Sequence, residues 1–175
     1  MLIFTRLLFL VKKRVNFNIM MINKDFLARA VKLAEDEIEK GAGPFGAVIV
    51  RNGEIISEAV NGVVNSIDPT AHAEILAIRQ AAKILDTHDL SDCILYTSCE
   101  PCPMCLGAIY WSGMKKVYYA ADRKDAAAAG FNDKYIYDEI SLPAEKRHIA
   151  FNRIPDVDGL EVFRIWNRFE NKIPY

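Results

Sequence analysis

The sequence predicts a three-layer α/β/α domain, in which helices cover both faces of one central sheet. Two observations lead to this prediction. Segments with a helical repeat of apolar residues alternate along the chain with short runs typical of buried strands. The chain has 175 residues, of which 51% are apolar and 26% charged, which suits one folded core and leaves little room for a second. The sequence contains no internal repeat, low-complexity tract or linker.

The start of the chain differs in character from the rest of the sequence. Residues 1–20 begin with an apolar stretch of ten, which Thr5 and Arg6 interrupt. Ten residues are too few to cross a bilayer, which takes about 20. The basic cluster comes after the apolar stretch, whereas a secretory signal has the reverse order. We therefore expect residues 1–20 to be an extension and residues 21–175 to form the domain.

A helix and a hairpin open this domain. The helix has Asn23 as a candidate N-cap and ends at Gly41. Residues 46–50 and 54–60 are expected to form two antiparallel strands, because Asn52-Gly53 supplies the positive φ angles of a tight turn. The apolar stripe of the helix consists of Phe26, Ala30, Ala34 and Ile38.

The second half continues the alternation of helices and strands. Alanine and isoleucine recur at helical spacing over residues 71–84, and residues 93–97 are typical of a short buried strand. Pro103 suits the first turn of a helix that runs to about residue 111. Residues 116–121 predict another strand, and a last helix begins where Asp158 and Glu161 resemble a capping box.

Charge and cysteine content limit the function classes. Twenty-two Lys and Arg oppose 23 Asp and Glu, so no large cationic surface is available for nucleic acid. We expect neither a nucleic-acid partner nor a membrane. Three of the four cysteines lie within Cys99 to Cys105, a spacing typical of metal or redox sites rather than of a disulfide framework. A reducing, cytoplasmic location is therefore expected.

Two short segments carry chemistry, His72-Ala73-Glu74 and Pro101 to Cys105, and each lies at the start of a predicted helix. Cys102 and Cys105 are three residues apart, so on a helix they share a face and can reach one ion. One imidazole and two thiolates suit Zn²⁺ and leave a fourth position open for water. An open position favours catalysis over a structural role. Two thiolates cancel the charge of Zn²⁺, so a neighbouring base becomes useful, and Glu74 is the candidate.

Cys99 leaves a second interpretation open. Cys99, Cys102 and Cys105 are evenly spaced, as in an iron–sulfur ligand run or a closed zinc knuckle. Both of these sites need a fourth ligand, and no cysteine follows Cys105. Cys93 and Cys99 are accordingly expected to be small buried residues.

The sequence resembles the cytidine/deoxycytidylate deaminase superfamily and, within it, is most similar to the bacterial guanine deaminases. The segments that carry this resemblance are Gly43 to Val48, Pro69 to Glu74, Thr97 to Cys105, Ala129-Gly130-Phe131 and Tyr175. The resemblance implies a mixed five-stranded sheet. It also implies hydrolysis of free guanine to xanthine and ammonia by a zinc-bound hydroxide, that is, a hydrolase acting on the C–N bond of a cyclic amidine.

The resemblance also implies how the base is bound. Guanine presents N1–H and its amine as donors, so an ionised carboxylate that only accepts would select it over adenine or cytosine. Asp133 matches the position of such a carboxylate. Asn61 and Ala73 match base-binding positions. Phe45 and Trp111 are candidates for an aromatic wall, with the core as their alternative. A homodimer with an exchanged C-terminal segment would place Tyr175 over the partner's site.

Two other functions remain open at this point. A tRNA adenosine deaminase would share both metal motifs, but it needs a basic surface for phosphates. A non-catalytic, zinc-stabilised binding module would keep the metal ligands, but it would have no use for Glu74.

Overall fold

The predicted hairpin forms at the predicted turn. The computed structural model describes residues 24–173, so residues 1–20 and the candidate cap Asn23 lie outside the described part. Strand β1 (Gly43–Arg51) pairs antiparallel with β2 (Glu54–Asn61). Asn52 and Gly53 between them have φ angles of 54° and 83°. Two successive positive angles are the geometry of a type I′ turn, so the prediction is confirmed.

The sheet has four strands among the described residues, rather than the five that the family resemblance implied. β3 (Cys93–Cys99) pairs antiparallel with β1 and parallel with β4 (Val117–Ala121), which gives the order β2-β1-β3-β4 and a mixed sheet. No fifth strand follows β4 because the next residues are rich in alanine and start a helix. Asp122 and Asp125 form a capping box for this helix, α5 (Arg123–Ala128).

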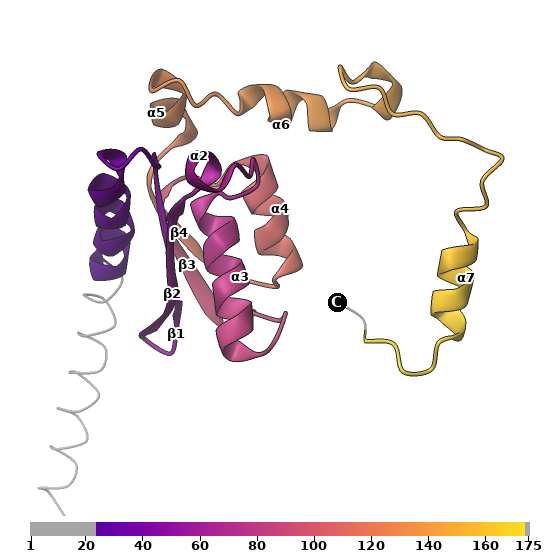
Figure 1. Ribbon diagram of the computed structural model, residues 1–175, viewed down its shortest axis with the longest axis horizontal. Helices are drawn as coiled ribbons and strands as arrows, with labels where there is room; N and C mark the ends of the chain where they lie inside the picture. Colours follow the sequence, from indigo (N-terminus) through magenta and orange to yellow (C-terminus); the bar gives the residue numbers. More distant parts are fainter. Residues whose placement is uncertain (1–23, 174–175) are drawn as a thin grey trace, which may run out of the picture. The chain divides into compact units, whose positions relative to one another are not determined.

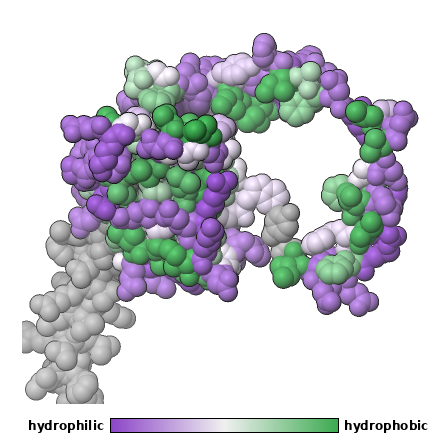
Figure 2. Space-filling model, in the orientation of Figure 1, coloured by the Kyte–Doolittle hydropathy of each residue, from purple (hydrophilic) through white to green (hydrophobic). Residues whose placement is uncertain are grey.

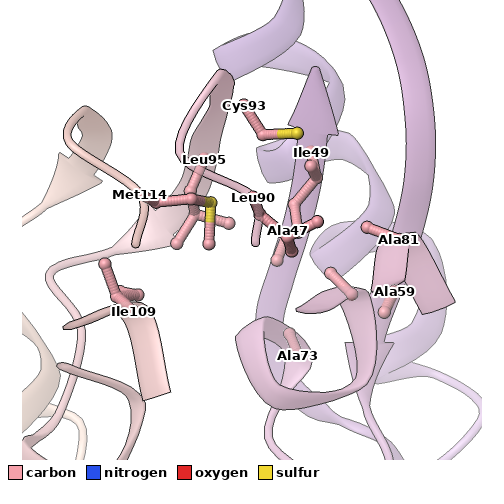
Figure 3. Close-up of a cluster of buried hydrophobic side chains, with 11 residues drawn as sticks. Ala47, Ile49, Ala59, Ala73, Ala81, Leu90, Cys93, Leu95, Ile109 and Met114 are labelled. Carbon is pink, nitrogen blue, oxygen red and sulfur yellow. The ribbon is translucent and has the colours of Figure 1, made fainter. Parts of the chain in front are cut away.

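Helices cover both faces of the sheet, which confirms the three layers (Figure 1). The helix of residues 24–38 lies on one face. α3 (Ala73–Leu85) and α4 (Pro103–Trp111) lie on the other. The smaller core cluster, under the first helix, contains Ala30, Val48, Val50 and Tyr96. The larger cluster lies between the sheet and α3 and α4, and Figure 3 shows its members, which include Ala47, Ile49, Ala73, Leu95 and Ile109.

The chain divides into two compact units, and the second begins at Asp133. It contains α6 (Lys134–Ser141), the short 3₁₀ helix η1 (Ala144–Lys146) and α7 (Glu161–Arg168). None of residues 133–173 is buried, and Figure 2 shows apolar side chains in green along this segment. Throughout residues 24–173, the helices are too short or too polar to cross a membrane.

Two details of the predicted helices are wrong. Ile38 is 51% exposed, so the apolar stripe of the first helix ends at Ala34. The capping box expected at Asp158 and Glu161 does not form. The Asp158 carboxylate instead accepts a hydrogen bond from the backbone N–H of Leu160, which is the N-cap residue of α7.

The loop before α3 contains a strained residue, Ile67. It follows the short helix α2 (Val63–Ser66), has φ 53° and ψ 40°, and is 92% exposed. A β-branched residue in this left-handed region costs about 1–2 kcal/mol.

We expect Ile67→Gly to stabilise the protein by about 0.5–1 kcal/mol in urea unfolding, after the entropy of glycine in the unfolded chain is subtracted. Val64→Gly, in α2, is the control with the opposite expected sign, and equal destabilisation by both variants would contradict the prediction.

Candidate metal centre and active site

The metal candidates lie where two helices begin on the same face of the sheet. His72 is the N-cap residue of α3, and Cys102 is the N-cap residue of α4, both in extended conformation. Pro103 occupies the first turn of α4, as predicted, because its missing N–H has no partner there in any case. Cys105 then falls one turn into α4. Helix N-termini favour anions, so this placement stabilises thiolates at both positions.

The structure brings His72, Cys102 and Cys105 into one cluster. Nδ1 of His72 lies 3.5 Å from Sγ of Cys102 and 3.5 Å from Sγ of Cys105. All three donor atoms lie within 4.8 Å of one another. In tetrahedral zinc sites with metal–sulfur distances of about 2.3 Å and metal–nitrogen distances of about 2.0 Å, the nitrogen–sulfur edge is about 3.5 Å. The residues present therefore fit zinc.

The cluster has three members within residues 24–173, and Cys99 is not one of them. Cys99 is 6% exposed, and its thiol donates to the backbone carbonyl of Asp122 at 3.7 Å. Cys93 is also buried, at 2% exposed. Both are the small buried residues that the sequence predicted. Three protein ligands leave one position of a tetrahedral ion to solvent or substrate, which is the arrangement of catalytic zinc.

The surroundings shift the pKa values of the two ligand thiols in opposite directions. The pKa of Cys102 is lowered to about 4, chiefly through its interaction with the neighbouring Cys105 side chain, and His72 adds to this effect. The same interaction, together with burial, raises the pKa of Cys105. The hydrogen bond to Cys102 also raises the pKa of His72. A metal ion that takes up both thiolates therefore releases the proton of Cys105.

Glu74 lies against this cluster. It is 5% exposed, and its Oε2 is 3.5 Å from Sγ of Cys105. Burial raises the pKa of its carboxyl. Residues two apart on a helix point in nearly opposite directions, but His72 is a non-helical cap, and so both side chains reach the same place. The sequence alone could not show this.

Three of the predicted substrate-binding residues, Asn61, Phe45 and Ala73, lie in the first unit. Asn61 ends β2 and is 7% exposed, and its Oδ1 accepts from the backbone N–H of Val63 at 3.2 Å. Phe45 in β1 packs edge-on against Phe131, with ring centroids 4.9 Å apart. The methyl group of Ala73 is buried in the larger core cluster, so its backbone is the part that it can offer to a ligand.

The three other candidates are Trp111 at the end of α4, Asp133 in the second unit, and Tyr175. Trp111 is the last residue of α4 and is 71% exposed. It lies eight residues beyond Pro103, about 12 Å along the helix axis. Asp133 is the N-cap residue of α6 and opens the second unit. Tyr175 lies outside the described residues.

Sequence reasoning did not identify two contacts that the structure shows. Phe131, named above only as part of the family resemblance, forms an aromatic pair with Phe45. Thr97 in β3 is fully buried, and its hydroxyl donates to Oε1 of Glu74 at 3.2 Å. The available signal was a pair of hydroxyl residues, Thr97 and Ser98, in a strand expected to be buried, because a buried hydroxyl needs a partner.

Comparison with known proteins agrees with this geometry. A family model that describes the cytidine and deoxycytidylate deaminase zinc-binding region matches residues 20–121, and the chain belongs to this family of zinc-dependent deaminases. Its metal is zinc, held by the cluster of one histidine and two cysteines.

Three individual relatives show which members of the family this chain is similar to. The guanine deaminase of Bacillus subtilis is 56% identical over 156 residues, covering 89% of this chain and all of the relative. Its crystal structure aligns with a TM-score of 0.85, over 87% of this chain and 98% of that one. A tRNA-specific adenosine deaminase of Aquifex aeolicus is 46% identical over 119 residues, which cover 67% of this chain and 77% of that protein. A structure solved with 2,6-diaminopurine is 40% identical, with a TM-score of 0.60 over 62% of this chain and 61% of that one.

Removing the metal with a chelator is expected to make Cys102 the first thiol to react with iodoacetamide. At pH 6 Cys102 is a thiolate, because its pKa of about 4 lies below that pH, and it is only partly buried. Burial raises the pKa of Cys93 to about 11, so its thiol stays protonated. Peptide mass spectrometry over time measures the order. Modification of Cys93 ahead of Cys102, or equal rates with and without chelator, would show that the ligand assignment is wrong.

Proposed function

We propose that this chain hydrolyses free guanine to xanthine and ammonia. The observation that carries the proposal is the Glu74 carboxylate, buried 3.5 Å from a metal-ligand sulfur in a chain 56% identical to a guanine deaminase. A zinc site that only stabilises a fold has no use for such a carboxylate. The buried acid therefore favours catalysis over a zinc-stabilised binding module.

Glu74 moves the protons of this reaction. Zinc, when bound, supplies a Lewis acid that activates water. Glu74 accepts the proton that the attacking water loses as its oxygen bonds to C2 of guanine. It gives this proton to the ring nitrogen. It then takes the second proton of that water, which is now on the C2 hydroxyl, and gives it to the exocyclic amine. The C2–N bond breaks, ammonia leaves and the C2 carbonyl of xanthine remains. Backbone N–H groups around Cys102 stabilise the negative charge that develops on the oxygen attached to C2.

Polarity of hydrogen bonding selects guanine. In our proposal Asp133 accepts hydrogen bonds from N1–H and from the amine, which adenine and cytosine cannot donate in the same way. Asn61 presents its amide N–H₂ to an acceptor on the base, because its Oδ1 already accepts from Val63. Phe45 and Trp111 supply apolar contact, and Ala73 supplies its backbone.

Asp133→Asn is expected to reduce the preference for guanine over other bases, and an unchanged preference would count against the role of Asp133 in selecting guanine.

The working protein is proposed to be a homodimer in the cytoplasm. Residues 133–173 have no buried side chain of their own, and Phe163 and Ile165 of α7 are 63% and 55% exposed. Apolar surface of this kind is typical of an interface. Exchange of this segment between two chains would cover it and bring Tyr175 over the partner's site. Sedimentation at the mass of one chain, or full activity after removal of the last few residues, would contradict this arrangement.

A substrate screen tests the proposed function directly. Purified, zinc-loaded protein is incubated separately with guanine, adenine, cytosine, their nucleosides and a tRNA anticodon stem-loop, and released ammonia is measured. We expect ammonia and xanthine from guanine. Ammonia from the stem-loop alone would indicate a tRNA adenosine deaminase, and none from any substrate would indicate a binding module. Residues 1–20 are proposed to be dispensable, so a chain that starts at residue 21 should give the same result.

A further inference from the structure

Thr97 lies in an interior strand of the sheet, with a neighbouring strand on each side. It lies in β3 and is paired on one side with Ala47 of β1 and on the other with Tyr119 of β4. Leu95, two residues earlier, belongs to the larger core cluster, so Thr97 faces α3 and α4 as well. Its side chain is fully buried. A hydroxyl on this apolar face costs about 1–3 kcal/mol unless it finds a hydrogen-bond partner, which valine of the same shape would not need.

The partner of this hydroxyl is Glu74. Oγ1 of Thr97 donates to Oε1 of Glu74 at 3.2 Å, and Oε2 of the same carboxylate lies 3.5 Å from Sγ of Cys105. The two carboxylate oxygens therefore differ: one is anchored to the sheet and the other faces the metal ligands. When Cys105 binds the metal as a thiolate it has no proton to donate. Among residues 24–173, Thr97 is then the side-chain donor that remains on Glu74.

We propose that Thr97 is a positioning residue, whose hydroxyl holds Oε1 of Glu74 so that Oε2 is the oxygen that carries the proton. This inference rests on the proposed function, since it assigns the geometry of the same reaction. The central strand fixes the hydroxyl, and the hydroxyl fixes the torsion of the carboxylate. A proton carrier displaced by about 1 Å loses as much as 100-fold in rate, so such an anchor has a kinetic effect.

Two substitutions separate the hydroxyl from the shape of the side chain. Thr97→Val keeps the shape and removes the donor, whereas Thr97→Ser keeps the donor and removes a methyl group. We expect Thr97→Val to lower kcat by about 10–100-fold with KM within about twofold, because substrate binding is not altered. Thr97→Ser should retain kcat within about threefold even where its melting temperature falls. Zinc content should stay at the wild-type value in both variants.

Ser57→Ala is the matched control. Ser57 is also a buried hydroxyl between the sheet and α3, donating to the backbone carbonyl of Ala77 at 2.8 Å, but it does not touch Glu74. We expect its loss to lower stability without lowering kcat. A wild-type kcat in Thr97→Val would overturn the proposal, and so would an equal loss in Thr97→Ser or in Ser57→Ala.

Crystal structures of the zinc-loaded variants give a second readout, which needs no substrate. The Glu74 carboxylate should turn away from Cys105 in Thr97→Val and stay in place in Thr97→Ser. An unmoved carboxylate in Thr97→Val would overturn the proposal. Absence of guanine turnover by the wild type would instead overturn the proposed function, so the two failures are distinguishable.

Discussion

Glu74→Gln is expected to lower kcat on guanine by about 10²–10⁴-fold, the usual contribution of a general acid–base group. Glutamine keeps the size of the side chain and can still accept the hydrogen bond of Thr97. It cannot take a proton from water or return one to the leaving amine. The metal ligands are untouched, so zinc content should stay at the wild-type value.

Steady-state kinetics and elemental analysis of the same preparation check this expectation. Glu58→Gln is the control, because Glu58 is a carboxylate on β2 whose partner is Arg29 of the first helix. Its loss should leave kcat within about twofold, as expected for an exposed ion pair remote from the chemistry. Near-normal turnover by Glu74→Gln would remove the proton carrier from the proposed mechanism.

Gly46→Ala is expected to destabilise the fold by about 3 kcal/mol or more, at the upper end of the cost of overpacking. A Cβ atom at this position would lie 2.2 Å from the backbone carbonyl oxygen of Ala30 and 3.0 Å from the backbone nitrogen of Ala34. Both are backbone atoms of the first helix, so no side-chain rotation can relieve the clash. The helix would have to move off the sheet.

Urea unfolding measures this cost, with Gly107→Ala as the control. Gly107 lies within α4, and an added Cβ there has no atom within 4 Å. Alanine is favoured over glycine inside a helix by about 0.5–1 kcal/mol, so this variant should unfold at a higher urea concentration. Equal midpoints for Gly46→Ala and the wild type would mean that the first helix does not pack against β1 as described.

Local sequence chemistry was enough to predict much of the fold. The Asn52-Gly53 turn, the start of α4 at Pro103 and the three layers are all confirmed. The metal cluster was also predictable from local sequence. Two of its three ligands are three residues apart at a helix start, and their residue types restrict the metal to a small set.

Features that depend on contacts between distant segments were not predictable. Gly46 packs closely against the backbone of Ala30 in the first helix, 16 residues away in the sequence. The hydroxyl of Thr97 donates to Glu74, which is 23 residues away. His72 and Glu74 reach the same place because His72 is a non-helical cap residue, which the sequence does not reveal. The role of the second unit was the least predictable, because its apolar side chains are exposed in the single chain. Their pattern does not say which surface packs against them.

The proposed mechanism requires that His72, Cys102 and Cys105 hold one zinc ion and leave a position open beside Glu74. X-ray absorption at the zinc edge of the purified protein tests this requirement. We expect one zinc per chain with two sulfur neighbours at about 2.3 Å and two lighter donors at about 2.0 Å, one of them imidazole. The second light donor should exchange with solvent anions. Three or four sulfur neighbours, or no zinc, would contradict the mechanism.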